Sequence, residues 1–124
     1  MIKLKLGISP CPNDTFIFHA LIHSLIDTDR YSFDTVITDV DELNRSAADE
    51  NPDITKLSFH AWLKLKEKYD LLRSGAALGF GCGPLIVSKT GSVDLNSHIA
   101  APGELTTAAL LLKLYLPGLS DITY

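Results

Sequence analysis

The chain has 124 residues, of which 46% are hydrophobic and 21% charged, and its formal net charge is −4. This length supports one small core and is too short for two complete domains. The acidic balance, with lysine and arginine scattered, argues against binding of nucleic acid or anionic membranes. The sequence lacks the run of about 18 apolar residues that a membrane span needs, and its N-terminus lacks the apolar segment of a signal peptide. We therefore expect a cytoplasmic protein.

The opening segment carries the most information about function. Residues 2–8 alternate between apolar and polar side chains, which predicts a strand. Residues 9–12, Ser-Pro-Cys-Pro, then break the strand, because proline fixes φ and removes a hydrogen-bond donor. A helix is predicted from about Thr15 to Leu25, with Asn13 or Asp14 as its N-cap. Such a corner at the carboxyl end of a strand is where open α/β sheets bind ligands.

The rest of the chain alternates between strand and helix patterns. Asp39 followed by Glu42 has capping-box spacing for a short helix to about Ala48. Ser58 is the candidate N-cap of a helix over 59–68. In that helix Phe59, Trp62 and Leu63 are expected to face inward. A further apolar helix is predicted over 106–116, and further strands are predicted at 35–40, 53–57, 71–73, 85–88 and 99–101. Short loops between alternating elements indicate an α/β fold with a largely parallel sheet.

Two later corners resemble the first one. Residues 55–58 end a strand and begin a helix, and they offer a cation (Lys56), a hydroxyl (Ser58) and free backbone N–H groups. Residues 101–107 do the same, with the adjacent hydroxyls of Thr106 and Thr107 at the first turn of the helix. Each corner alone is most simply a capped helix. Three of them on one side of a sheet predict an anion-binding mouth, because helix N-termini attract carboxylates.

The glycine-rich stretch over 75–83 is not a nucleotide-binding loop. A dinucleotide fingerprint requires a helix directly after the glycines, whereas here Pro84 leads into a predicted strand. The chain also lacks the Gly-Lys-Ser/Thr of a phosphate-binding loop. We interpret the stretch as a crossover or lining loop where backbone approaches a ligand or a strand closely.

Histidines and cysteines suggest no metal site or disulfide. His19 and His23 have i, i+4 spacing, but no third ligand is placed to complete a zinc site. His60 follows a candidate N-cap and could reach the cleft, and His98 is expected to be solvated. Cys11 and Cys82 are expected to remain reduced in the cytoplasm and to be ordinary loop residues.

Several of these segments together resemble the 1,4-dihydroxy-6-naphthoate synthases, enzymes of the futalosine route to menaquinone. The resemblance covers nearly the whole chain in the same order, and the octapeptide Ser-Pro-Cys-Pro-Asn-Asp-Thr-Phe is its most specific element. The segments that carry it are residues 9–16, 55–58, 72–79, 83–85, 102–103 and 106–108.

The resemblance implies a two-lobed α/β fold like that of the type II periplasmic binding proteins, with substrate held between the lobes. Residues 1–92 would then form most of lobe one and residues 93–124 the start of lobe two, with the hinge near 92–97. It implies a carbon–carbon lyase without a cofactor or metal, which converts cyclic dehypoxanthinylfutalosine to 1,4-dihydroxy-6-naphthoate. The expected partner is therefore a small carboxylated aromatic substrate.

Site residues carry over from the family only in part. The resemblance implies that substrate is bound by Lys56, Leu57 and Ser58 and by the pair Thr106 and Thr107. The family's proton acceptor is a histidine of lobe two, and the chain stops before that position, so no catalytic residue is assigned. We expect these 124 residues alone to be catalytically silent, and their apolar last helix to favour self-association.

Three alternatives remain open from the sequence. A cytoplasmic solute-binding-type protein would capture a small carboxylated metabolite without catalysis. The sister enzyme chorismate dehydratase has the same fold but a different opening segment. A structural fragment or partner module would fit if the short form is the natural product.

Overall fold

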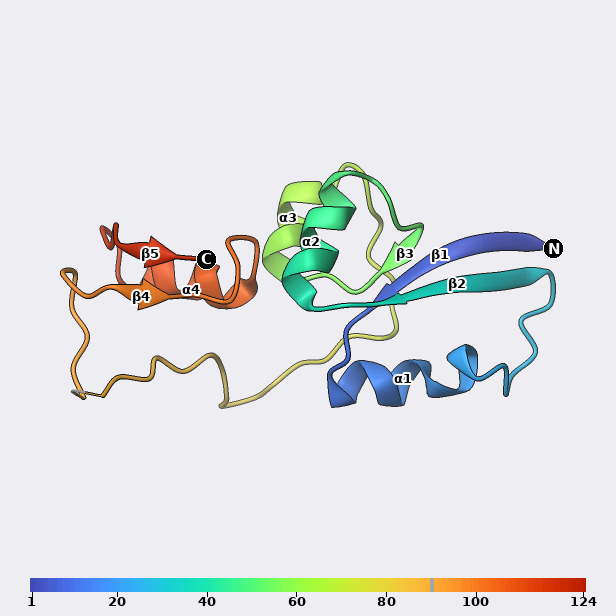
Figure 1. The fold of residues 1–124 in the computed structure, drawn as a ribbon, viewed down its shortest axis with the longest axis horizontal. Coiled ribbons are helices and arrows are strands. Elements are labelled where there is room, and N and C mark those ends of the chain that lie inside the picture. The colour runs from blue at the N-terminus through green and yellow to red at the C-terminus, as the bar shows by residue number, and fades with distance from the viewer. Residues whose placement is uncertain (90) are drawn as a thin grey trace.

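A computed structural model describes residues 1–89 and 91–124 (Figure 1). Their helices and strands form two groups, joined by a segment over 66–98 whose described residues contain neither helix nor strand. Figure 1 shows this segment running extended from the first group to the second. No helix in the described ranges is long and apolar enough to cross a membrane. The elements in chain order are β1 (Ile2–Ile8), α1 (Pro12–Ile22), β2 (Tyr31–Ile37), α2 (Val40–Ala48), β3 (Ile54–Thr55), α3 (Phe59–Leu65), β4 (Ile99–Ala100), α4 (Thr107–Tyr115) and β5 (Ile122–Thr123).

The first group is built on a three-stranded parallel sheet with the order β2-β1-β3. β1 pairs with β2 over its whole length, from Ile2 opposite Tyr31 to Ile8 opposite Ile37. In Figure 1, α1 lies on one side of this sheet and α2 and α3 lie on the other. The core comprises Leu6, Ile8, Leu43, Ala47 and Ala61 in this group and Ala109 and Leu112 in α4. The predicted α/β class with parallel strands is therefore confirmed.

The second group holds a separate two-stranded parallel sheet, β4-β5, beside α4. β4 pairs with β5 through Ile99 opposite Ile122 and Ala100 opposite Thr123. α4 buries Ala109 and Leu112 and leaves Leu114 and Tyr115 exposed. It contacts α3 of the first group, so the two groups meet through these two helices.

The boundaries of α1 differ from the prediction. The helix begins at Pro12, and its N-cap is Cys11, which makes no side-chain capping bond. Proline fits the first helical position because its missing N–H would have had no helical partner there. The helix ends at Ile22 and not at Leu25, because Ser24 adopts a left-handed conformation with φ of 54°.

The predictions for helix 59–68 were wrong in length and in orientation. α3 ends at Leu65, after which the backbone N–H groups of Lys68 and Tyr69 turn back onto the Leu65 carbonyl oxygen. Phe59 and Leu63 are exposed, and His60 and Ala61 are buried instead. The side of α3 that becomes buried is the side that packs against α2 and α4.

Two predicted strands, 71–73 and 85–88, are not strands. Their apolar side chains are exposed, Leu85 by 86% and Val87 by 90%. Apolar β-prone residues form a strand only where a partner strand accepts their backbone hydrogen bonds, and within the described residues none pairs with them. Strand 35–40 was predicted too late, since β2 already begins at Tyr31.

Candidate functional site

Three corners of the chain lie at helix N-termini and meet through direct contacts. The first is the loop between β1 and α1, the second is the β3–α3 connection, and the third is the turn before α4. The corners are separated by 40 residues or more in sequence. The first two corners are joined by an ion pair and the last two by contacts of His60. The five predicted site residues all belong to the second and third corners.

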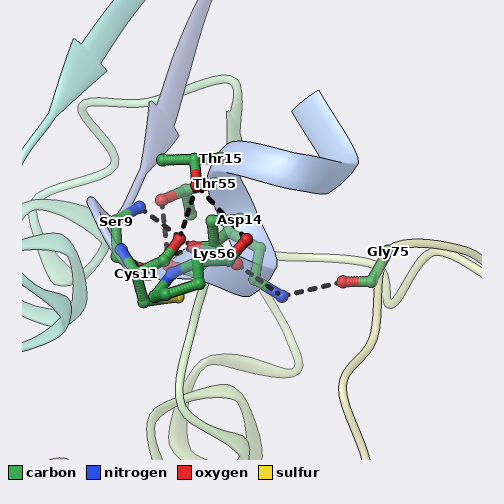
Figure 2. A network of polar contacts seen from close by, with 8 residues as sticks. Ser9, Cys11, Asp14, Thr15, Thr55, Lys56 and Gly75 are labelled. Carbon is green, nitrogen blue, oxygen red and sulfur yellow. Dashed lines mark hydrogen bonds and ion pairs between the residues drawn. The ribbon is translucent and has the colours of Figure 1, made fainter. Parts of the chain in front are cut away.

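The first corner is organised by a buried carboxylate. Asp14 belongs to the first turn of α1 and is buried. Its Oδ2 accepts hydrogen bonds from the Ser9 backbone N–H at 3.0 Å and the Ser9 hydroxyl at 2.7 Å. The Thr15 hydroxyl donates to the carbonyl oxygens of Cys11 and Pro12. The Ser-Pro-Cys-Pro segment is thereby folded back onto the helix that it starts (Figure 2).

Lys56 connects the second corner to the first. Its Nζ lies 3.5 Å from Oδ1 of Asp14 and donates a hydrogen bond to the Gly75 carbonyl oxygen at 2.7 Å. Figure 2 shows the ammonium between these two partners. The cation that the sequence predicted at this corner therefore lies beside a buried carboxylate, which balances its charge. The glycine-rich segment approaches the site through a backbone carbonyl oxygen, at Gly75.

Ser58 is held by a buried asparagine. Ser58 is the N-cap of α3, as predicted, but its side chain does not cap the helix. Its hydroxyl accepts from Nδ2 of Asn44 at 3.1 Å, and its backbone N–H donates to Oδ1 of Asn44 at 3.0 Å. Asn44 lies in α2 and is fully buried. The backbone N–H and the hydroxyl of Ser58 are therefore both fixed by one side chain. The preceding residue, Leu57, is half-buried and contributes to the corner by its backbone position.

Thr106 and Thr107 form the third corner and contact His60. Thr106 is the N-cap of α4, and its hydroxyl accepts from the Ala109 backbone N–H and donates to the Gly103 carbonyl oxygen. The backbone N–H of His60 donates to the Thr107 hydroxyl at 3.4 Å, and Nδ1 of His60 lies 3.2 Å from the Thr106 carbonyl oxygen. His60 thus lies two residues from Ser58 and in contact with both threonines.

The structure therefore places all five predicted binding residues, Lys56, Leu57, Ser58, Thr106 and Thr107, in adjoining corners. Sequence reasoning missed Asn44 altogether, and it missed that Asp14 pairs with Lys56 and that Gly103 lies against Asp41. The burial of Asn44 could have been predicted from its spacing. It lies three residues before Ala47, on the side of α2 that packs inward.

The histidine pair and the two cysteines form neither a metal site nor a disulfide in the described residues. The rings of His19 and His23 are in contact, with centroids 4.5 Å apart and planes tilted by 51°. The described residues contain no cluster of three or more metal-ligating side chains. Cys11 and Cys82 are exposed free thiols. A hollow of about 650 Å³ lies between the start of α1 and residues 76–79, and one of about 1010 Å³ lies between α4, β4 and residues 84–89.

Comparison with known proteins places this arrangement in a family. The architecture defines an α/β protein with polar corners at helix N-termini. The menaquinone biosynthesis family matches residues 4–124, and the chain belongs to that family. The chain is 45% identical over 119 residues to a protein of Thermus thermophilus named 1,4-dihydroxy-6-naphthoate synthase, and 37% identical over 113 residues to a protein of the same name from Streptomyces coelicolor.

A solved structure shows the same fold. The crystal structure of protein AF1704 from Archaeoglobus fulgidus matches with a TM-score of 0.85 and 37% sequence identity, over 97% of this chain and 44% of that one. The sequence matches cover 95% and 90% of this chain but 43% and 40% of the Thermus and Streptomyces proteins. The chain thus spans less than half the length of the relatives that it matches.

Proposed function

We propose that residues 1–124, within a chain of the length of these relatives, form the substrate-binding half of a 1,4-dihydroxy-6-naphthoate synthase. The reaction is the conversion of cyclic dehypoxanthinylfutalosine to 1,4-dihydroxy-6-naphthoate, a carbon–carbon lyase reaction of menaquinone biosynthesis in the cytoplasm. The observation that carries the proposal is the contact between α3 and the Thr106–Thr107 corner. It joins the Lys-Leu-Ser stretch and the threonine pair, the two segments for which the family resemblance implies substrate binding.

The proposed fold is two-lobed and resembles the type II periplasmic binding proteins. Residues 1–92 form most of lobe one, and residues 93–124 begin lobe two. Two separate parallel sheets support this division, as does the segment without helix or strand that connects them. In this division the lobes meet at α3 and α4, so the second and third corners lie at the proposed boundary.

The residues of this chain bind and orient the substrate. The hydroxyls of Ser58 and Thr107 accept hydrogen bonds from Asn44 and from the His60 backbone, so each keeps its proton to donate to a substrate carboxylate. Lys56 adds a positive charge beside them. Proton transfer requires a base within hydrogen-bond reach of the substrate. In the family that base is a histidine of lobe two, which we place outside residues 1–124.

Product formation tests the activity. A full-length chain can be made by completing residues 1–124 with the rest of the Thermus thermophilus relative. We expect this completed chain to release 1,4-dihydroxy-6-naphthoate from cyclic dehypoxanthinylfutalosine, detected by absorbance, and residues 1–124 alone to give none. Binding of the substrate without turnover by the completed chain would support a solute-binding protein instead. Dehydration of chorismate would support the sister enzyme.

Removal of the Thr107 hydroxyl tests the binding site. Thr107→Val keeps the shape of the side chain and removes its hydroxyl, so we expect substrate affinity to fall by about 1.5–3 kcal/mol, as for a lost charge-assisted hydrogen bond. Stability should change by about 1 kcal/mol or less, because Thr107 is half-buried and its hydrogen bond is long. Thr107→Ser should restore binding. Isothermal titration calorimetry on the completed chain measures the substrate affinity of both variants, and urea denaturation measures their stability. Normal affinity of Thr107→Val would show that Thr107 does not bind the substrate.

A further inference from the structure

Asp14 is a buried carboxylate to which the proposed function assigns no role. Its side chain is 4% exposed, and its two oxygens face different partners. Oδ2 takes both donors of Ser9, and Oδ1 faces the ammonium of Lys56. A buried charge is tolerated only when it is paired and hydrogen-bonded. Asp14 meets both conditions, and its place in the first turn of α1 is also favourable for a negative charge.

The Lys56 ammonium has two partners and keeps at least one N–H donor for a ligand. An ammonium group has three N–H donors. The Gly75 carbonyl oxygen takes one at 2.7 Å, and Oδ1 of Asp14 forms an ion pair with the group at 3.5 Å. The Lys56 side chain is 21% exposed, so the group remains accessible from solvent. Figure 2 shows the resulting chain of contacts from Ser9 through Asp14 and Lys56 to Gly75.

We propose that Asp14 is a positioning residue for substrate binding, which acts through Lys56. Its carboxylate fixes the lysine ammonium between the first corner and the glycine-rich segment, so that the remaining N–H donor is oriented toward a substrate carboxylate. A flexible lysine side chain loses rotamer entropy when it binds a ligand. Asp14 already restricts the Lys56 side chain before the substrate binds, so less rotamer entropy is lost on binding. This effect is preorganisation. This role rests on the proposed function for the identity of the substrate, but not for the Asp14–Lys56 contact itself.

Steady-state kinetics of the completed chain tests the role in binding. Asp14→Asn keeps the size of the side chain and removes its charge. We expect KM for cyclic dehypoxanthinylfutalosine to rise about 10-fold with kcat within about 3-fold, because the interaction lost belongs to binding and not to the chemical step. Asp14→Glu should recover part of the affinity. The matched control is Asp34→Asn, which removes the carboxylate of an exposed lysine pair, Lys3–Asp34, away from the site; it should leave KM unchanged.

A double-mutant cycle shows whether Asp14 acts through Lys56. Lys56→Met should raise KM by at least as much as Asp14→Asn. Adding Asp14→Asn to Lys56→Met should then have little further effect on KM, because the group that Asp14 positions is already gone. Additive effects on KM would mean that Asp14 acts independently of Lys56, and would overturn the proposal.

Chemical labelling of Lys56 gives a readout that does not depend on activity. With limiting acetic anhydride and mass spectrometry, we expect Lys56 to be acetylated several-fold faster in Asp14→Asn than in the unsubstituted chain, since the ammonium has lost its partner. Lys3 serves as the internal reference and should respond only to Asp34→Asn. If Asp14→Asn does not fold, as circular dichroism would show, Ser9→Ala replaces it, because it loosens the carboxylate and keeps its charge. An unchanged labelling rate at Lys56 overturns the proposal. Altered labelling in a completed chain without turnover would refute the proposed function alone.

Discussion

Replacement of Asn44 by alanine is expected to destabilise the protein by roughly 2–3 kcal/mol, because a buried donor and acceptor lose their partner. Asn44 is fully buried and makes two hydrogen bonds to Ser58, at 3.0 and 3.1 Å. Alanine leaves the Ser58 backbone N–H unpaired at the start of α3. Urea denaturation of the 124-residue chain, followed by the fluorescence of Trp62 in α3, measures the change in the free energy of unfolding.

Asn51 provides a matched control for Asn44. Its side chain also makes two hydrogen bonds, one with the Lys5 ammonium and one with the Ser46 hydroxyl, but it is exposed. Water replaces both partners in Asn51→Ala, so the stability should change by about 0.5 kcal/mol or less. Equal effects of the two substitutions would show that burial of Asn44 does not matter. In the completed chain, Asn44→Ala should also raise KM, because Ser58 is no longer fixed.

Local signals predicted those parts of the fold that local forces determine. The alternation of apolar and polar side chains predicted β1 with its observed bounds, Ile2–Ile8. The capping residues Asp39 and Ser58 located the starts of α2 and α3, since a helix N-terminus is marked by its cap. The apolar run predicted from Thr106 located α4 to within one residue, and Thr106 is its N-cap. The first helix was placed too late because proline was treated as a barrier to helix formation and not as a first helical residue.

Contacts between distant segments account for what the sequence did not reveal. Lys56 was recognised as a cation, but its partner Asp14 is 42 residues away, so its charge balance depends on the tertiary fold. His60 is buried because α4 packs against α3 from 47 residues further along the chain. The apolar residues of 71–73 and 85–88 satisfied a strand pattern, but pairing requires a neighbouring strand that pattern alone does not supply. The five binding residues came from family resemblance, and their substrate contacts stay a prediction.

Gly103 lies in close contact with the first group. Its φ is 153°, and it is buried in the turn before α4, where its carbonyl oxygen accepts from the Thr106 hydroxyl. A Cβ atom at this position would overlap the side-chain carboxylate of Asp41 in α2. Asp41 also pairs with Arg45, one turn further along α2. Only glycine therefore allows the threonine corner to approach α2 as closely as it does.

Gly103→Ala is expected to destabilise the protein by roughly 2–4 kcal/mol, from the strained φ and the overlap with Asp41 together. Gly118→Ala separates the two causes, because Gly118 also has a positive φ, of 103°, but has open space where a Cβ would lie. That control should cost about 1 kcal/mol. Adding Asp41→Ala to Gly103→Ala should recover the steric part of the loss. If Gly103→Ala were no worse than Gly118→Ala in urea denaturation, the close approach of the two groups would not contribute to stability. The threonine corner would then owe its position to His60 and α3 alone.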